Sequence, residues 1–232
     1  MSNKVIIFDL DDTLISEKDY IDSGFKSVSN IFAQKYKLSS EDVYFIMKNL
    51  FKKDSSKVFN RLFEKYKISY DEVDIKELVR IYREHIPNIR LLEDAELLIK
   101  ELNKRNIRMG IITDGYKETQ SRKIKVLELE KVTEKIIITD ELGKEYWKPD
   151  KRSFEMMKEY FNIEYSNMIY IGDNIKKDFL APNKLGMMSI QIEREEGVYK
   201  DSTVEIKEYL PQIKVKNLLE ILKILELEEE NV

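Results

Sequence analysis

The chain of 232 residues has a net charge of −4, is 36% charged and 42% hydrophobic, and contains no cysteine. This length suits one sizeable domain or a core with a smaller insert, and the composition is that of a globular protein. The absence of cysteine excludes disulfides, thiolate metal sites and cysteine nucleophiles. Lysine and arginine are scattered along the chain, so no basic stripe indicates nucleic acid binding.

The N-terminal residues predict a cytoplasmic protein. Residues 1–4 run directly into an apolar segment, without the basic stretch and long apolar stretch of a secretory signal. The longest apolar runs, such as 5–8 and 136–138, fall far short of the roughly 20 residues that span a bilayer. We therefore expect no signal peptide, no membrane-spanning helix and a cytoplasmic location.

Five short apolar segments predict the strands of a parallel sheet. They are residues 5–8, 109–112, 136–138, 168–171 and 187–192. Uninterrupted apolar runs of this length suit strands that are buried on both faces. Helical patterns at about 91–105, 153–161 and 178–185 alternate with the later strands. The alternation predicts an α/β core, a Rossmann-like doubly wound parallel sheet whose ligands lie beyond the carboxyl ends of its strands.

Residues 16–87 interrupt this alternation and predict a separate helical domain. They contain no good strand and fit four helices, near 20–35, 40–50, 55–66 and 73–85. We expect an inserted α-helical cap domain at 16–87 and a core domain formed by 1–15 and 88–232. Because the insert follows the first strand directly, it is a candidate lid over the carboxyl end of that strand.

The first polar cluster, Asp9-Leu10-Asp11-Asp12-Thr13, follows the first predicted strand. Asp9 and Asp11 are two residues apart, so an extended backbone would direct both side chains to the same side. Two adjacent carboxylates repel each other unless a cation joins them, which indicates a metal site. An ordinary polar turn after the strand is the alternative. Asp12 would point the other way and receives no chemical role.

The second cluster is Thr113-Asp114-Gly115, after the second strand. A hydroxyl, a glycine and exposed N–H groups form a natural cradle for an anion, although many strand-to-helix turns have the same composition. A helix over 116–127 would add its favourable N-terminal dipole.

The third cluster places Lys148 on the loop before Pro149, a residue that suits the opening of a helix. Alone, such a lysine is usually a solvated charge.

The fourth cluster begins with Gly172-Asp173-Asn174 and ends at Asp178. An aspartate at a strand end, with a second one five residues later, can hold a hard cation. Asp178 could instead be only the cap of the following helix.

In this order, the four clusters resemble the signature of the haloacid dehalogenase superfamily. That signature has a nucleophilic Asp, a second Asp two residues later followed by Thr, a Thr or Ser after the next core strand, a Lys, and Gly-Asp with a further Asp downstream. The resemblance covers the chain from Val5 to about Ile192 and includes a helical cap of the family's first type. The segments Asp11-Asp12-Thr13 and Thr113-Asp114-Gly115 look most like those of its small-molecule phosphatases.

The resemblance implies a catalytic role for three side chains. Asp9 would be the nucleophile that forms an aspartyl-phosphate, and Asp11 would protonate the leaving oxygen and then deprotonate the attacking water. Lys148 would neutralise charge on Asp9 and on the transferred group. Mg²⁺ would be bound by the carboxylates of Asp9 and Asp173 and by the backbone carbonyl of Asp11.

The same resemblance implies the residues around the phosphate and the metal. Thr113 and the N–H groups of Asp114 and Gly115 would hold the phosphate oxygens. Asp178 would orient metal-bound water, and Asn174 would lie beside the metal without an assigned role.

We therefore expect a magnesium-dependent hydrolase acting on phosphoric monoesters, with a sugar phosphate or nucleotide as substrate. Nucleic acid and membrane are not expected as partners, and the protein would be a monomer or homodimer. A phosphotransferase or phosphomutase of the same fold is the main alternative, because the sequence does not say whether water is excluded from the site. A 2-haloacid dehalogenase, which needs neither metal nor proton donor, and a non-catalytic binding protein fit less well, since no signature residue is missing.

Overall fold

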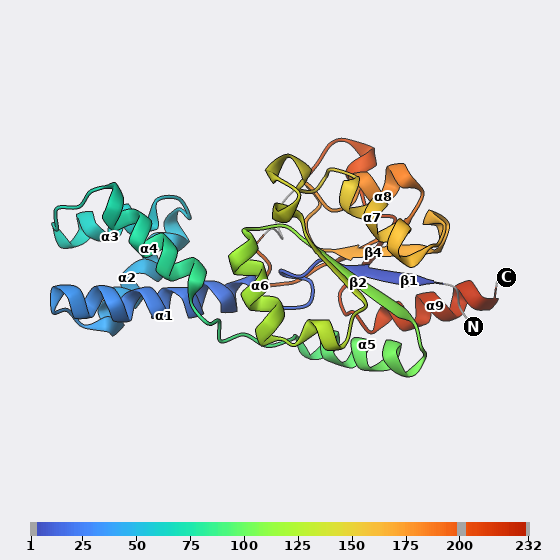
Figure 1. Cartoon of the computed structure of the whole chain (residues 1–232), viewed down its shortest axis with the longest axis horizontal. Helices are drawn as coiled ribbons and strands as arrows, with labels where there is room; N and C mark the ends of the chain where they lie inside the picture. The colour runs from blue at the N-terminus through green and yellow to red at the C-terminus, as the bar shows by residue number, and fades with distance from the viewer. Residues whose placement is uncertain (1–3, 199–202, 231–232) are drawn as a thin grey trace. The chain divides into compact units, whose positions relative to one another are not determined.

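The chain folds as two units, a core unit of residues 1–17 and 90–232 and a helical unit of residues 18–89. The computed structural model describes residues 4–198 and 203–230 (Figure 1). The expectation that residues 1–3 carry no secretory signal therefore lies outside the described residues. Both connections between the units fall two residues later than the boundaries that we predict from the sequence, 16 and 87.

The core unit is built on a parallel sheet of six strands in the order β3-β2-β1-β4-β5-β6. The strands are β1 Val5–Phe8, β2 Arg108–Thr113, β3 Lys135–Ile138, β4 Met168–Gly172, β5 Met188–Ile192 and β6 Ile213–Val215. The predicted doubly wound α/β fold is confirmed, and the first five strands coincide with the five apolar segments. β6 was not predicted, because three residues with an exposed lysine in the middle do not stand out from a loop.

Helices cover both faces of this sheet, with α7 and α8 on one side and α5 and α9 on the other (Figure 1). The core helices are α5 Glu93–Lys104, α6 Lys117–Val126, α7 Arg152–Phe161, α8 Leu180–Leu185 and α9 Glu220–Glu230. Short 3-10 turns occur at Leu129–Lys131, Thr139–Glu141, Lys144–Tyr146, Tyr165–Asn167 and Lys207–Tyr209. Ile7, Phe154 and Tyr170 belong to one buried apolar cluster, so the strands are buried as continuous apolar runs require.

The order of the strands determines where a ligand can bind. β1 lies between β2 and β4, so the chain leaves β1 toward β2 and β3 and later returns to the other side of β1 as β4. In an open parallel sheet, a crevice forms at the carboxyl ends of the strands where the winding direction reverses. The polar residues that follow β1 and β4 are therefore placed at this crevice.

The helical unit contains the four helices predicted for this part of the chain. They are α1 Glu17–Tyr36, which begins at the last core residue, α2 Ser40–Lys53, α3 Val58–Tyr66 and α4 Glu72–Glu84. The Ser39 side chain accepts a hydrogen bond from the Asp42 N–H, and Asp71 forms a capping box with Asp74. Phe25, Phe32 and other apolar side chains make a core of the unit's own.

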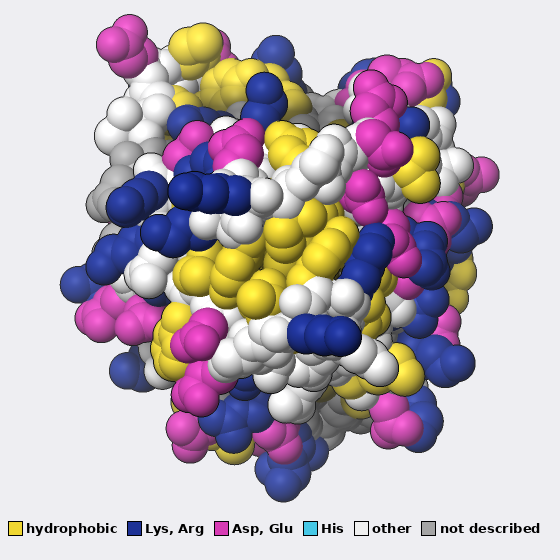
Figure 2. Space-filling model, turned by 90° about the vertical axis from the view of Figure 1, so that its left-hand side faces the viewer, with side chains coloured by type: hydrophobic (Ala, Val, Ile, Leu, Met, Phe, Trp, Pro, Cys, Tyr) yellow, Lys and Arg dark blue, Asp and Glu magenta, His cyan; other side chains and the backbone are white. Residues whose placement is uncertain are grey.

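Hydrophobic side chains also gather on one face of the molecule, bordered by lysine and arginine (Figure 2). Apolar atoms make up more than half of the surface of most folded proteins, so this patch alone does not identify a binding surface. None of the helices among the described residues is both long and apolar enough to cross a membrane.

Candidate active site

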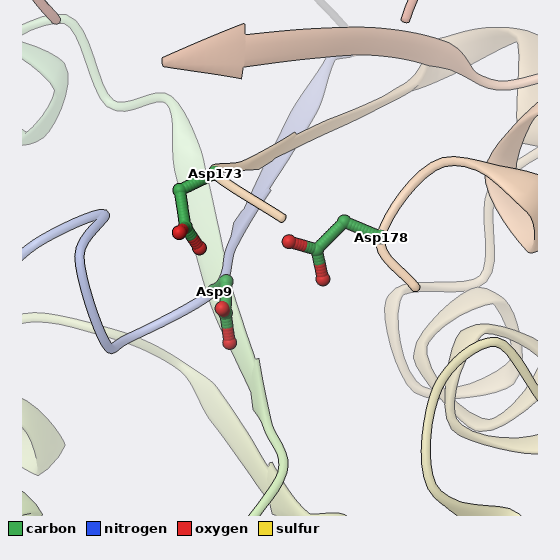
Figure 3. Close-up of side chains that lie close together, drawn as sticks. All are labelled: Asp9, Asp173 and Asp178. Atoms are coloured by element: carbon green, nitrogen blue, oxygen red, sulfur yellow. The ribbon is translucent and has the colours of Figure 1, made fainter. Parts of the chain in front are cut away.

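Three aspartates from two neighbouring strand ends form the centre of the candidate site (Figure 3). Asp9 directly follows β1 and Asp173 directly follows β4, and Asp178 lies five residues further on. Each contributes one carboxylate oxygen to a group whose members all lie within 4.8 Å of one another. The backbone explains this meeting: Phe8 pairs with Ile171, and the Asp9 N–H donates to the Ile171 carbonyl at 2.8 Å.

Burial makes the ionised forms of Asp9 and Asp173 costly. It raises the pKa of Asp9 to about 6, although the positive charge of Lys148 opposes the rise. Burial, followed by the negative charges of Asp178 and Asp9, raises the pKa of Asp173 well above its ordinary value. Within residues 4–198 and 203–230, the Asp173 carboxylate has no hydrogen-bond or ion-pair partner. An unpaired carboxylate that faces a second one suits a divalent cation, which prefers oxygen ligands.

Lys148 is completely buried and holds two of the aspartates together. Its Nζ lies 2.8 Å from Asp9 Oδ1 and 2.8 Å from Asp178 Oδ1, and it donates to the Tyr170 hydroxyl at 2.8 Å. The Tyr170 hydroxyl in turn donates to Asp178 Oδ1 at 3.2 Å. Burial would lower the pKa of Lys148, but Asp178 and Asp9 outweigh it and hold that pKa above its ordinary value. Lys148 is therefore a permanent positive charge beside Asp9.

Asp178 is fixed by the turn that precedes α8. Its Oδ2 accepts the Asn174 N–H at 2.8 Å, and the Asn174 side chain accepts the Lys176 N–H at 3.0 Å. A Cβ atom on Gly172 would lie 2.6 Å from Asp178 Oδ2, so only glycine allows this close approach. With both of its oxygens engaged, Asp178 positions Lys148. Asn174 shapes the turn.

The Asp11 carboxylate does not join the aspartate group, contrary to the expectation from its spacing to Asp9. Its Oδ1 lies 2.6 Å from Lys123 Nζ, and its Oδ2 accepts from Gln120 Nε2 at 3.0 Å. The strand ends at Phe8 and Asp12 adopts a positive φ of 50°, so the two-residue alternation of a strand does not continue to Asp11. The Asp12 carboxylate accepts backbone N–H groups of Glu17 and Val198, which is a structural role.

Gln120 and Lys123 on α6 were not predicted as site residues, yet both contact the Asp11 carboxylate. Both side chains are buried. Positions three apart share one helix face, and this face of α6 reaches Asp11. A sequence signal could have identified Gln120 and Lys123. They are two polar residues, three apart, on the helix face where apolar residues are expected.

The turn after β2 has free donors for an anion. In the described part of the chain, the N–H groups of Asp114 and Gly115 donate to no protein acceptor. Thr113 is buried and its hydroxyl accepts from Gln120 Nε2. Gly115 has a φ of +131°, which a residue with a side chain adopts only under strain, and α6 begins two residues later. This is the arrangement expected of a phosphate cradle.

A cavity of about 570 Å³ adjoins Asp173 in the core unit. Asp173, Gln191 and Arg194 are among the residues that line it, together with Lys214 and Lys216 from β6 and the residues after it. Asp173 is therefore accessible from the carboxyl edge of the sheet, where a ligand of a doubly wound sheet binds, whereas Asp9 and Asp178 are buried.

Comparison with known proteins identifies the family to which a chain with this fold and this aspartate group belongs. The sequence model of the haloacid dehalogenase-like hydrolase family matches residues 6–192. The protein belongs to this family, which confirms the resemblance drawn from the four polar clusters. The glyceraldehyde 3-phosphate phosphatase of Pyrococcus furiosus is 27% identical over 230 residues, which are 97% of this chain and 94% of that protein.

Solved structures of the same fold include proteins with different reactions. A HAD phosphatase from Thermococcus onnurineus has a TM-score of 0.62 and 21% identity, and the match covers 96% of this chain and 97% of that one. A 2-haloacid dehalogenase from Pseudomonas syringae pv. tomato has a TM-score of 0.64 and 19% identity, with 96% and 98% covered. These similarities establish the fold, and the reaction has to be argued from the side chains.

Proposed function

We propose that this hydrolase is a magnesium-dependent phosphatase that cleaves a small phosphate ester through an aspartyl-phosphate on Asp9. The observation that carries the proposal is the unpaired Asp173 carboxylate facing Asp9, with the buried Lys148 cation on the other side of Asp9. A dehalogenase needs no metal, so dehalogenase activity would not explain the unpaired carboxylate of Asp173. The Pyrococcus furiosus relative, named for its action on glyceraldehyde 3-phosphate, supports a short sugar phosphate as the substrate class.

The proposed reaction assigns two successive steps to the side chains. One Asp9 carboxylate oxygen bonds to phosphorus while the ester P–O bond breaks, and Asp11 gives the leaving oxygen its proton. Asp11 then takes a proton from water as that water attacks phosphorus, and the Asp9–phosphorus bond breaks to release inorganic phosphate. Lys148 offsets negative charge on Asp9 and on the phosphoryl oxygens.

The remaining residues of the proposal bind the metal and the phosphate. Asp9, Asp173 and the Asp11 carbonyl would hold Mg²⁺, which when bound neutralises charge on the phosphate. Thr113 and the N–H groups of Asp114 and Gly115 would hold the phosphate oxygens. Asp178 would act through Lys148. A contact of Asp178 or Asn174 with metal-bound water stays a prediction. A cytoplasmic location also stays a prediction.

We also propose that the helical unit of residues 18–89 is the cap that limits the site to small substrates. The proposal rests on its insertion between β1 and β2, the first of which carries Asp9. A cap that excludes water could favour transfer of the phosphoryl group to a second acceptor, and the choice between hydrolysis and transfer therefore needs measurement.

The proposed function is tested by phosphate release from p-nitrophenyl phosphate and from a panel of phosphorylated metabolites that includes glyceraldehyde 3-phosphate. We expect turnover with Mg²⁺, none after EDTA treatment, and higher kcat/KM on small esters than on phosphopeptides. Activity on 2-haloacids without metal would instead establish the dehalogenase. Phosphorylated acceptor without free phosphate would establish a transferase.

Asp11→Asn should impair hydrolysis in a way that depends on the leaving group. An alkyl phosphate needs a proton on its departing oxygen, whereas p-nitrophenolate leaves without one. We expect a loss of about a hundredfold or more in kcat on an alkyl phosphate, within the range of general acid catalysis, and a clearly smaller loss on p-nitrophenyl phosphate. Lys123→Met removes the ion pair at Asp11 Oδ1, and its loss in kcat should likewise be larger on the alkyl phosphate than on p-nitrophenyl phosphate. Equal losses on both substrates would count against Asp11 as the proton donor.

Magnesium binding should weaken as the pH falls through the range in which Asp9 takes up a proton. Burial raises the pKa of Asp9 to about 6, and a metal ligand has to be deprotonated. Above this pH the carboxylate is free to bind the metal, and below it protons compete. One such proton makes the apparent affinity about tenfold weaker at pH 5 than at pH 7. Titration calorimetry of the metal-free protein measures this apparent affinity. An affinity that does not change between pH 5 and pH 7 would contradict the assignment.

A further inference from the structure

The predicted phosphate cradle contains a negative charge of its own. Asp114 lies between Thr113 and Gly115, and its side chain is almost completely buried. Burial would raise the pKa of Asp114, but Lys148, Lys177 and hydrogen bonds to the carboxylate hold it below its ordinary value, so the group is ionised at neutral pH. A fixed carboxylate in the loop that receives a phosphate dianion repels it unless a cation compensates.

The contacts of Asp114 show which cation does so. Oδ1 accepts from the Thr139 hydroxyl at 2.8 Å and from the backbone N–H of Lys148 at 3.1 Å, and neither donor carries a charge. Oδ2 lies 3.0 Å from Lys177 Nζ. Lys177 is the only lysine or arginine in the described part of the chain whose side chain pairs with Asp114.

The two buried lysines of the site are already paired with other carboxylates. Lys148 lies between Asp9 and Asp178, and Lys123 pairs with Asp11. Lys177 comes from the turn between β4 and α8, which also carries Asp173, whereas Asp114 follows β2. The Lys177–Asp114 pair therefore joins the predicted phosphate loop to the predicted metal-binding turn, and its lysine side chain is 27% exposed.

We propose that Lys177 is a positioning residue that neutralises Asp114 and thereby allows the Thr113–Gly115 loop to bind phosphate. The inference rests on the proposed function, because it assumes that this loop receives the phosphoryl group. Lys177 acts on the ligand through Asp114, so removing its charge should weaken phosphate binding only while Asp114 keeps its own charge.

The test is the inhibition constant of inorganic phosphate, measured against p-nitrophenyl phosphate hydrolysis with saturating Mg²⁺. Lys177→Met should raise this constant by about tenfold, the effect of one uncompensated charge in a partly buried site. KM for the ester should rise with it, and kcat should change less. Lys177→Arg keeps the charge and should stay within about twofold of the parent protein. Lys176→Met, which removes the exposed neighbouring lysine, is the matched control. Its inhibition constant should also stay within about twofold of the parent value.

The decisive comparison is the double variant Lys177→Met with Asp114→Asn. It lacks both charges, so phosphate inhibition should return to within about threefold of the parent value. Lys177→Gln keeps a polar partner for Asp114 without the charge, and should behave like Lys177→Met if the methionine variant does not fold. Far-UV circular dichroism and thermal melting establish that each variant is folded.

Three results would overturn the inference, and they can be told apart. If the parent protein is an active phosphatase but Lys177→Met and Lys176→Met have the same inhibition constant, Lys177 has no such role. A double variant as weak as Lys177→Met alone also excludes the role, because the effect would not depend on the Asp114 charge. If the parent protein hydrolyses no phosphate ester with Mg²⁺, the proposed function fails and this inference fails with it.

Discussion

Replacement of Asp9 by asparagine should leave a folded protein that hydrolyses phosphate esters at least about a thousandfold more slowly. The amide oxygen of asparagine is too weak a nucleophile to form the covalent intermediate, so the loss should appear in kcat on every substrate. Asparagine has the shape of aspartate, and the buried Lys148 keeps Asp178 as a partner. The measurement is kcat/KM for the parent and the variant on p-nitrophenyl phosphate and on one alkyl phosphate.

The stability of the same variant gives an independent check. Burial raises the pKa of Asp9 from 3.8 to about 6, so the folded protein holds this proton more tightly than the unfolded chain does. The resulting stabilisation is present below pH 3.8 and is lost as the pH rises through 6. At pH 8, the metal-free asparagine variant should therefore be at least as stable as the metal-free parent protein.

Asparagine can revert to aspartate by deamidation, and a small reverted fraction would mimic residual activity. Mass spectrometry of the assayed sample is therefore the control. Turnover near the parent rate in a sample free of aspartate would refute Asp9 as the nucleophile.

The parallel sheet could be predicted from the sequence because its strands are buried on both faces. The first five strands are mostly apolar, with a polar or glycine residue beside each, although β5 includes Ser189 and Gln191. β6 lies at the sheet edge with Lys214 exposed, and its pairing with β5 depends on tertiary contacts rather than on its own residues. The sequence pattern therefore identifies buried strands better than an edge strand.

The meeting of Asp9 and Asp173 could also be predicted, because parallel strands bring their carboxyl ends to one edge. The side chains that contact the site aspartates could not be predicted from the sequence. Tyr170 looks like one more apolar residue of β4, yet its hydroxyl contacts both Lys148 and Asp178. Lys123 reaches its partner across a loop from the second turn of a helix, and only the packing of α6 determines where a long side chain ends.

Lys148→Met should reduce both stability and activity, and the two losses have separate causes. Lys148 is completely buried among Asp9, Asp178 and Tyr170, so methionine leaves two buried carboxylates without their cation. Removing one partner of a buried ion pair costs about 3–5 kcal/mol in the free energy of unfolding. Loss of a fixed charge that stabilises the transition state lowers kcat by about a hundredfold or more. Chemical denaturation and steady-state kinetics measure the two effects.

A second substitution separates these two roles. Asp178→Asn removes the deeper of the two unpaired carboxylates, so the double variant Lys148→Met with Asp178→Asn should recover part of the lost stability. It still lacks the positive charge 2.8 Å from Asp9 Oδ1, and its kcat should remain as low as that of Lys148→Met. If the double variant recovered activity along with stability, Lys148 would only neutralise Asp178. Activity that stays low in a stabilised protein is the result expected of a lysine that acts on the reacting phosphate.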